Sequence, residues 1–319
     1  MYIFKYILKR FGLMLLTFLI IMTICFTMVK LLPQNDPVTF GKDASIILRR
    51  REMLGYGKPI LEQYATFLKR VATAWDWGVG ETLKAGKDVA AIFAEKLPAT
   101  MLVNLHSFFL SVPLGILFGI YAALRKNKPE DHIISTGVML FVSVPSYVYA
   151  FLVQYLLCFK LGWFPFLMKE GTDYFSWAMY VSIFPAVLSL SFGFIAGLTR
   201  FTRAELTEVL TNDYMLLART KGLTKRQATI RHALRNAMVP IFPDIIGAFI
   251  GILGGSLIIE NIFGVPGVGN LYIQSITTRD YNFFMMLSAF YTFVSLTAAI
   301  LVDISYGIID PRIRMGAKK

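Results

Sequence analysis

Six long apolar stretches constrain the fold of this chain more than any other feature. They cover residues 11–32, 98–124, 133–159, 177–199, 237–259 and 283–302. Each has the roughly 20 residues that a helix needs to cross the hydrocarbon core of a bilayer. With 56% hydrophobic and only 16% charged residues, a soluble fold would have too few polar side chains to cover its surface. We therefore expect an all-α integral membrane protein with six transmembrane helices.

The first apolar stretch has features of both a signal peptide and a retained helix. Lys5, Lys9 and Arg10 precede it, as basic residues precede the apolar core of a signal peptide. However, the uncharged run from Phe11 to Val29 exceeds the usual length of about 7–15 residues, and no small-residue cleavage pattern follows it. We expect it to remain as the first span.

The distribution of Lys and Arg predicts the orientation. Eighteen of them lie in the segments 1–10, 125–132, 200–236 and 303–319, whereas the short segments 160–176 and 260–282 carry three. Basic residues collect in cytoplasmic loops, so both termini are expected in the cytoplasm. This bias accounts for the net charge of +12 without a nucleic-acid partner.

Residues 33–97 are too long for a simple connection and are expected to form an extracellular cap. Apolar residues from Ile60 to Trp75 recur at helical spacing, and Asp43 can cap a shorter helix before Ile46. Two interpretations remain open. The cap is either a lid over the spans or a docking surface for an external partner. In the second case the candidate contacts are Trp75, Trp77 and Trp163.

Small residues are concentrated in two of the apolar stretches. They either let helices of this chain pack closely or line a path or a subunit seam, and both interpretations remain open. Glu260, at the end of the fifth span, is a further candidate, and Asp244 and Asp303 are the other acidic residues in or beside spans. No series of acids through the membrane suggests a proton relay. The small residues are Gly193, Gly197, Gly247, Gly251, Gly254 and Gly255.

The sequence lacks a recognisable catalytic constellation. The segment from Gly80 to Asp88 is the nearest approach to a phosphate-binding loop, but it has one residue too many between its glycines and Asp88 where a hydroxyl is needed. Cys25 and Cys158 form no metal-binding pair, and the three histidines are far apart. We expect no enzymatic activity, metal or cofactor in this chain.

The loop 200–236 carries the most specific pattern. Asn212 or Asp213 can cap a short helix, and Gly222 suits a left-handed helix end. Thr224 and Gln227 then have the spacing of a capping box that starts a second helix. Helical spacing places Tyr214, Leu217, Ala218 and Lys221 on one face of the first helix, and Ile230, Leu234, Ala237 and Met238 on one side of the second.

The segment from Ala218 to Gly222, followed by Arg-His-Ala-Leu-Arg-Asn-Ala-Met-Val-Pro240, resembles the coupling loop of ABC-importer permeases of the oligopeptide/dipeptide branch. The general importer pattern also matches at Leu234. The chain departs from that general pattern at four positions: Leu216, Leu217, His232 and Arg235 stand for Glu, Ala, Ile and Pro.

Other segments extend the resemblance over essentially the whole chain, least over 38–95. Glu260–Gly269 resembles the family's Glu-x-x-Phe-x-x-Pro-Gly-x-Gly segment, and Arg279-Asp280-Tyr281 follows it. The tail from Asp310 to Arg314 also matches. Near the N-terminus, Tyr6–Arg10 and Leu32–Pro37 resemble the first of two paired permeases, with Pro-Gln-Asn-Asp-Pro in place of Pro-Gly-Asp-Pro.

The resemblance implies a type I ABC-importer fold and a role as half of a translocation path for oligopeptides or dipeptides. It implies a second homologous permease, an external substrate-binding protein and two cytoplasmic subunits that bind ATP and Mg²⁺. Nickel chelates, glutathione or oligosaccharides are alternative substrates, and an ion-coupled secondary transporter or a membrane enzyme are competing functions. The residues expected to contact the ATPase are Asp213, Tyr214, Leu217, Ala218, Lys221, Gly222, Leu223, Thr224 and Arg226.

Overall fold

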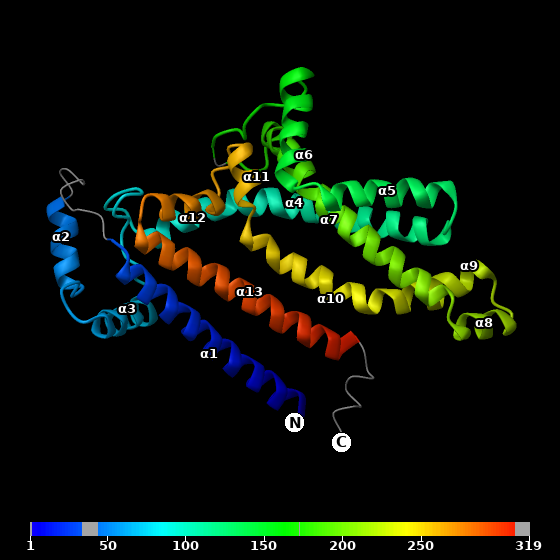
Figure 1. Ribbon diagram of the computed structural model, residues 1–319, viewed down its shortest axis with the longest axis horizontal. Coiled ribbons are helices and arrows are strands. Elements are labelled where there is room, and N and C mark those ends of the chain that lie inside the picture. Colours follow the sequence, from blue (N-terminus) through cyan, green and yellow to red (C-terminus); the bar gives the residue numbers. More distant parts are fainter. Residues whose placement is uncertain (1, 34–43, 172, 310–319) are drawn as a thin grey trace. The chain divides into compact units, whose positions relative to one another are not determined.

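A computed structural model describes residues 2–33, 44–171 and 173–309, apart from the side chains of residues 2–6, 46, 47, 308 and 309. Asp43 and the Asp310–Arg314 motif, two features of the sequence analysis, lie outside the described residues, as do residues 34–37 of the N-terminal motif. Regular structure in the described part is helical, with one isolated β-bridge between Val79 and Asp88 (Figure 1). The all-α prediction is confirmed there.

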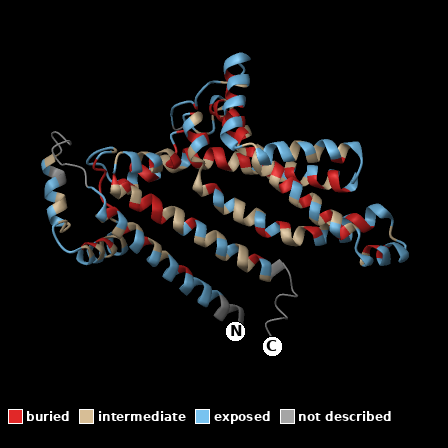
Figure 2. Ribbon diagram, in the orientation of Figure 1, coloured by how far each residue is buried: buried red, intermediate tan, exposed pale blue. Residues whose placement is uncertain are grey.

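Within the part of the chain that the structure describes, five segments are helical, long and apolar enough to cross a membrane. Much of each of these helices is exposed in the isolated chain (Figure 2). The exposed side chains include Leu16, Leu117 and Phe249, each about half exposed or more. Such surfaces suit lipid rather than water. The segments contain α1 (Tyr2–Leu31), α4 (Val89–Leu124), α7 (Trp177–Leu210), α10 (Arg235–Gly251) and α13 (Tyr281–Ile309).

The continuous helix expected over 133–159 is wrong. The helix α5 (Pro129–Ser143) ends before Pro145, and α6 (Ser146–Val153), which continues into the π-helical η2 (Gln154–Lys160), starts after it at an angle of 104°. Pro145 has no N–H to continue the helix and disfavours the helical conformation at Val144, which is extended at φ −89° and ψ 129°. The two parts form one bent span or a re-entrant pair.

The helix expected over 237–259 is also interrupted. Its regular part, α10, passes into the 3₁₀ turn η4 (Ile252–Gly254), and Gly255 then takes a left-handed φ of 66°. Two short helices follow, α11 (Leu257–Ile262) and α12 (Val268–Thr277). The run of small residues therefore ends a helix instead of continuing it.

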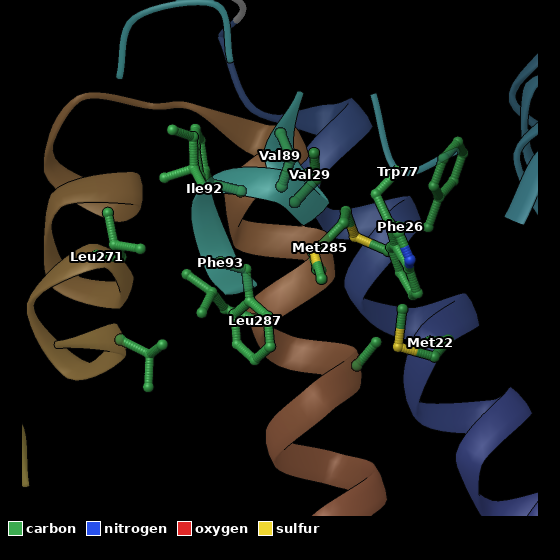
Figure 3. Packing of buried hydrophobic residues seen from close by; sticks show 14 of the residues in the cluster. Met22, Phe26, Val29, Trp77, Val89, Ile92, Phe93, Leu271, Met285 and Leu287 are labelled. Carbon is green, nitrogen blue, oxygen red and sulfur yellow. The ribbon is translucent and has the colours of Figure 1, made fainter. Parts of the chain in front are cut away.

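The chain forms two compact units, and the first combines both ends of the sequence. It contains Met1–Met101, Leu253–Glu260 and Pro266–Thr297. Its core includes Met22, Phe26 and Val29, which share one face of α1, and Met285 and Leu287 of α13 (Figure 3). Aromatic rings extend this cluster, with Phe26 5.3 Å from the Phe67 ring centroid.

The cap contains the two helices that the sequence predicts. The first is α2 (Ala44–Met53), and the second is α3 (Ile60–Ala74), which buries Gln63 and Phe67 against the unit core. The basic residues of α2 are held by acids of the loop that follows α3. Arg50 pairs with Asp76 at 3.2 Å, and Arg51 pairs with Glu81. These contacts make the cap an ordered structure.

The second unit contains Leu102–Ile252, Asn261–Val265 and Ala298–Lys319, and the pair α4–α7 is packed closely within it. A Cβ atom added at Gly115 would lie 2.8 Å from Leu198, and one at Gly119 would lie 2.5 Å from Thr202. Ser107 and Ser191 are hydrogen-bonded across the same pair at 3.0 Å. Sequence analysis missed this pair of glycines, although they have the GxxxG spacing that favours close approach of helices in lipid.

A partly buried ion pair joins α7 to α5. Arg203 donates two hydrogen bonds to Asp131, from Nε to Oδ1 at 2.5 Å and from Nη2 to Oδ2 at 2.7 Å. The Asn127 amide also donates to the Asp131 carboxylate, at 2.9 Å. This two-pronged geometry fixes both the spacing and the rotation of the two helices.

The close approach at Gly119 leads to a stability prediction. Gly119→Ala should lower the free energy of unfolding in detergent by about 1–3 kcal/mol, because the new methyl group forces α4 and α7 apart. The matched control is Gly137→Ala on α5, where nothing lies within 4 Å of the added Cβ. That variant should be neutral or stabilised by up to about 1 kcal/mol. Equal melting temperatures for the two variants would contradict the packing described here.

Candidate functional site: a helix pair with a glycine turn

The loop 200–236 forms the predicted pair of helices around a glycine turn. The first is α8 (Asp213–Thr220), and the second is α9 (Lys225–Ala228), which continues into the π-helical η3 (Thr229–Leu234). Gly222 has a φ of 90°, as expected for a left-handed turn. The Gly222 amide donates to the Arg219 carbonyl at 3.0 Å, so the turn closes the end of α8.

The start of the second helix has the expected capping box. The Gln227 amide donates to the Thr224 hydroxyl at 3.3 Å, and the Gln227 side chain accepts from the Thr224 amide at 3.0 Å. At the start of the first helix, Asn212 occupies the capping position but its side chain makes no capping hydrogen bond there. The turn between the helices is therefore fixed from both sides, by Gly222 and by the capping box.

The prediction that Leu217 and Ala218 share one face of α8 is wrong. Ala218 is buried together with Met215, packed against Leu206 of α7 and Ala228 of α9, and Tyr214 is partly buried in the same cluster. Leu216 and Leu217 are exposed instead. Ala218 thus faces its own chain, and α8 presents Leu216 and Leu217 outward.

The face predicted for the second helix is wrong at Ile230, because that helix is not α-helical throughout, whereas Leu234 and Ala237 lie on the buried side as expected. Ile230 is exposed, whereas Ala228, Ala233 and Ala237 are buried. These alanines are five and then four residues apart. The π-helical turn contributes an additional residue, which shifts the buried face by one position. A constant period of 3.6 residues therefore predicts that Ile230 is buried, whereas it is exposed.

A surface hollow of about 270 Å³ lies beside the pair. It is lined by residues of both helices and by the end of α7. Asp213, Arg219 and Lys225 contribute charges to it, and Leu216 contributes an apolar side chain. Lys221, Leu223, Thr224 and Arg226 lie at or beyond the turn, where all but Leu223 are exposed. An exposed apolar patch surrounded by charges has the composition of a protein contact surface.

The three tryptophans expected at a docking surface differ in exposure. Trp75 and Trp163 are about two-thirds exposed. Trp77 is only 6% exposed, with its ring edge-on to Phe67 at 5.9 Å between centroids, so it offers no surface to a partner. Trp77 is buried because Trp75 ends α3 in a left-handed conformation, which turns the chain back onto the core.

Glu260 is at the centre of a buried polar cluster. It is 2% exposed, and its carboxylate accepts from the Thr100 hydroxyl at 2.8 Å and from the Gly269 amide at 2.9 Å. Thr100 in turn accepts from the Val268 amide at 2.9 Å. Burial raises the pKa of Glu260, and these hydrogen bonds oppose the rise. The carboxylate thus satisfies amides at the start of α12.

The glycines of the same motif make room for this cluster. A Cβ atom at Gly267 would lie 2.3 Å from the Thr100 hydroxyl, and one at Gly269 would lie 2.7 Å from the Glu260 carboxylate. The Glu-x-x-Phe-x-x-Pro-Gly-x-Gly spacing therefore has a structural basis. Glu260 binds the turn to α4 and does not face an open path.

The segment that partly resembles a phosphate loop binds a carboxylate of its own chain. The amides of Glu81, Thr82 and Leu83 all donate to Asp280 Oδ2, at 2.8 to 2.9 Å. Asp280 is fully buried, and that burial raises the pKa of its carboxyl despite these hydrogen bonds. The turn therefore offers these three amides to Asp280 and not to a phosphate.

The glycines expected to pack helices or line a path have different surroundings. A Cβ atom at Gly193 would lie 2.9 Å from the Tyr149 hydroxyl, and one at Gly247 would lie 3.2 Å from Val302. At Gly197, Gly251 and Gly254, no atom of the described residues lies within 4 Å of an added Cβ. Within this chain, the first two are packing positions and the other three face open space.

Comparison with known proteins identifies the family. The model described as "Binding-protein-dependent transport system inner membrane component" matches residues 115–315. The chain belongs to this family of permeases. The model for the N-terminal part of such components matches residues 3–104. The coupling-loop segment and the Glu260 motif both lie inside the larger match.

Relatives of this permease match it over nearly its whole length. The dipeptide transport system permease protein of Lactococcus lactis subsp. cremoris is 34% identical, over 98% of this chain and 99% of the relative. The oligopeptide transport system permease protein of Escherichia coli K12 is 33% identical, over 97% of this chain and 99% of the relative.

A solved structure supports the fold. The permease matches a chain in the crystal structure of an amino acid ABC transporter with histidines, with a TM-score of 0.51 and 21% sequence identity, over 68% of this chain and 94% of that chain. This permease has the type I ABC-importer fold and is a multi-pass membrane protein.

Proposed function

We propose that this permease is one of two homologous membrane subunits of an ATP-driven importer of oligopeptides or dipeptides. The second permease completes the path, two cytoplasmic ATPases drive it, and an external binding protein delivers the substrate. The assignment of peptides as the substrate rests on one observation. The chain matches dipeptide and oligopeptide permeases at 33–34% identity along nearly its whole length.

The helix pair α8–α9 supplies the coupling. Its buried side is packed against the ends of α4 and α7, so a push on α8 is transmitted to two spans. Its exposed side carries Leu216 and Leu217 for the ATPase contact. ATP binding and outward opening are then linked by the free energy of this contact.

The chain itself performs no covalent chemistry in this proposal. ATP and Mg²⁺ bind to the partner subunits, and this subunit has no cofactor of its own. Uptake by the complete complex of permeases, ATPases and binding protein tests the proposal. ATP-dependent accumulation of a short peptide in proteoliposomes supports it. Accumulation of another solute, but not of any peptide, would instead favour nickel chelates, glutathione or oligosaccharides.

Gly222 leads to a prediction about coupling. Gly222→Val places a β-branched side chain at a φ of 90°, which costs about 1–2 kcal/mol and favours another orientation of α8. A cost of this size reduces the correctly oriented population by roughly tenfold. The stimulation of ATPase activity by loaded binding protein should fall accordingly, while the complex still assembles.

The control for this variant is Gly222→Asn, because asparagine tolerates left-handed backbone conformations. No atom lies within 4 Å of a Cβ at this position, so crowding cannot explain a difference between the two variants. Stimulated ATPase activity should be close to wild type for Gly222→Asn. If Gly222→Val also keeps full stimulation, the loop is only a connection between spans.

We further propose that both termini and the coupling loop are cytoplasmic. In sealed cells, and in a Cys25→Ser, Cys158→Ala background, a membrane-impermeant thiol reagent should label Glu170→Cys. It should not label Lys126→Cys or Thr224→Cys before the cells are opened. All three positions are exposed on the chain, so burial does not decide the result. Labelling of Thr224→Cys in sealed cells would reverse the orientation.

The cap is proposed to receive the external binding protein. Trp75→Ala and Trp163→Ala remove exposed side chains and should weaken stimulation by loaded binding protein without changing thermal stability. Trp77→Ala should instead destabilise the protein by about 3–5 kcal/mol, because it leaves a cavity in the core. Unchanged half-maximal concentrations of binding protein for both exposed variants would remove these residues from the docking surface.

A further inference from the structure

An open hollow along α7, bordered by Asp244 of α10, lies apart from the surfaces proposed for coupling and docking. It has a volume of about 610 Å³ and lies between α7 and α10. We call it the charged hollow, because one wall carries Arg200 and another carries Asp244. Its volume lies within the range of about 300–1,000 Å³ that is typical of small-molecule sites.

The two charges of the charged hollow are both exposed. Asp244 lies within the apolar stretch 237–259, four residues after Pro240, whereas Arg200 is the first residue of the basic loop 200–236 and directly follows the span 177–199. Among the residues that the structure describes, no ion pair involves either of them. Each therefore retains its hydrogen-bonding capacity for another molecule.

An exposed charge within a membrane helix is costly if lipid covers it. Such residues are accommodated where they face water or protein. Two glycines, Gly193 and Gly197, form part of the wall of the hollow, whose lining is otherwise largely apolar apart from Arg200 and Asp244. At Gly197 no atom lies within 4 Å of an added Cβ, so this part of the wall is open. We infer that the hollow contains water and lies on the substrate path.

The chemistry of the lining indicates what the charged hollow binds. A carboxylate such as that of Asp244 binds an ammonium group, and the aromatic side chains Phe194 and Phe201 in the same lining favour cations by the cation–π effect. Arg200 offers a planar fork of donors to a carboxylate. A short peptide with free termini carries one group of each kind.

We propose that the charged hollow is a transit subsite for zwitterionic peptides, with Asp244 binding the peptide ammonium and Arg200 its carboxylate. The proposal rests on the proposed function, since it takes peptides as the cargo. It adds the residues of this chain that contact the peptide after the binding protein releases it. A transit site of this kind favours weak binding, because the peptide must also leave.

The first test measures whether the charged hollow contains water. In the complete complex, reconstituted in nanodiscs in a Cys25→Ser, Cys158→Ala background, Gly197→Cys should react with a cationic, membrane-impermeant thiol reagent. Leu117→Cys, at an exposed apolar position of α4, is the control and should react at least about tenfold more slowly, because lipid suppresses the thiolate. Equal, slow reaction at both positions would overturn the proposal.

The second test measures recognition of the peptide. Trialanine should slow the labelling of Gly197→Cys, whereas N-acetyl-trialanine amide, which has no charged termini, should not. Asp244→Asn should weaken protection by about tenfold, and Asp244→Glu should retain most of it, because the ionic hydrogen bond is kept. Equal protection by the two peptides, or full protection in Asp244→Asn, would contradict the assignment.

Uptake by the unmodified complex separates this proposal from the proposed function. If that complex imports trialanine with ATP and binding protein but trialanine gives no protection at Gly197→Cys, only the subsite is wrong. If no peptide is imported at all, the importer proposal fails first. Retained stimulation of the ATPase in Asp244→Asn, with reduced peptide transported per ATP, would support a role in the path and not in coupling.

Discussion

Lipid provides no hydrophobic driving force between helices, and the contacts within this permease depend on that constraint. Helices must approach until backbones touch or polar groups pair. Gly115 and Gly119 allow the first between α4 and α7, and Arg203 and Asp131 provide the second between α7 and α5. Because α7 takes part in both contacts, it fixes the positions of α4 and α5 within its unit. The helix pair α8–α9 is packed against its end, and the charged hollow lies along its side.

In the proposed function, this permease acts through its surfaces and not through reacting groups. The helix pair α8–α9 has one side buried among alanines and the other side exposed. A force on the exposed side is therefore transmitted through the buried side to α4 and α7. The polar clusters around Glu260 and Asp280 have the opposite character, because they are buried and largely satisfied within the chain. Burial and hydrogen bonding thus distinguish residues that hold the fold from residues that can meet a partner.

The sequence predicts the helices well, because membrane spans and capping residues have strong local signals. Gly222 and the Thr224 capping box needed no tertiary information. Pro145 is a sequence signal for a helix break, but the length of the apolar run around it favoured a continuous span. The burial of Trp77 and the shift of register at Ile230 could not be predicted from the sequence. The first depends on the left-handed conformation of Trp75, and the second on the π-helical turn at residues 229–234. A side chain two residues from exposed Trp75 is thereby buried.

The first unit has a consequence for how the protein is made. Its cap precedes residue 100, but the carboxylate that binds the amides of Glu81 to Leu83 belongs to Asp280, and Phe283 and Met285 complete the same core. During synthesis from the N-terminus, nearly 200 residues separate the cap from these partners. The cap therefore cannot finish folding until the last span has been made and inserted. Chains truncated before that span lack the groups that close the cap, so a correctly folded cap indicates that synthesis has reached the last span.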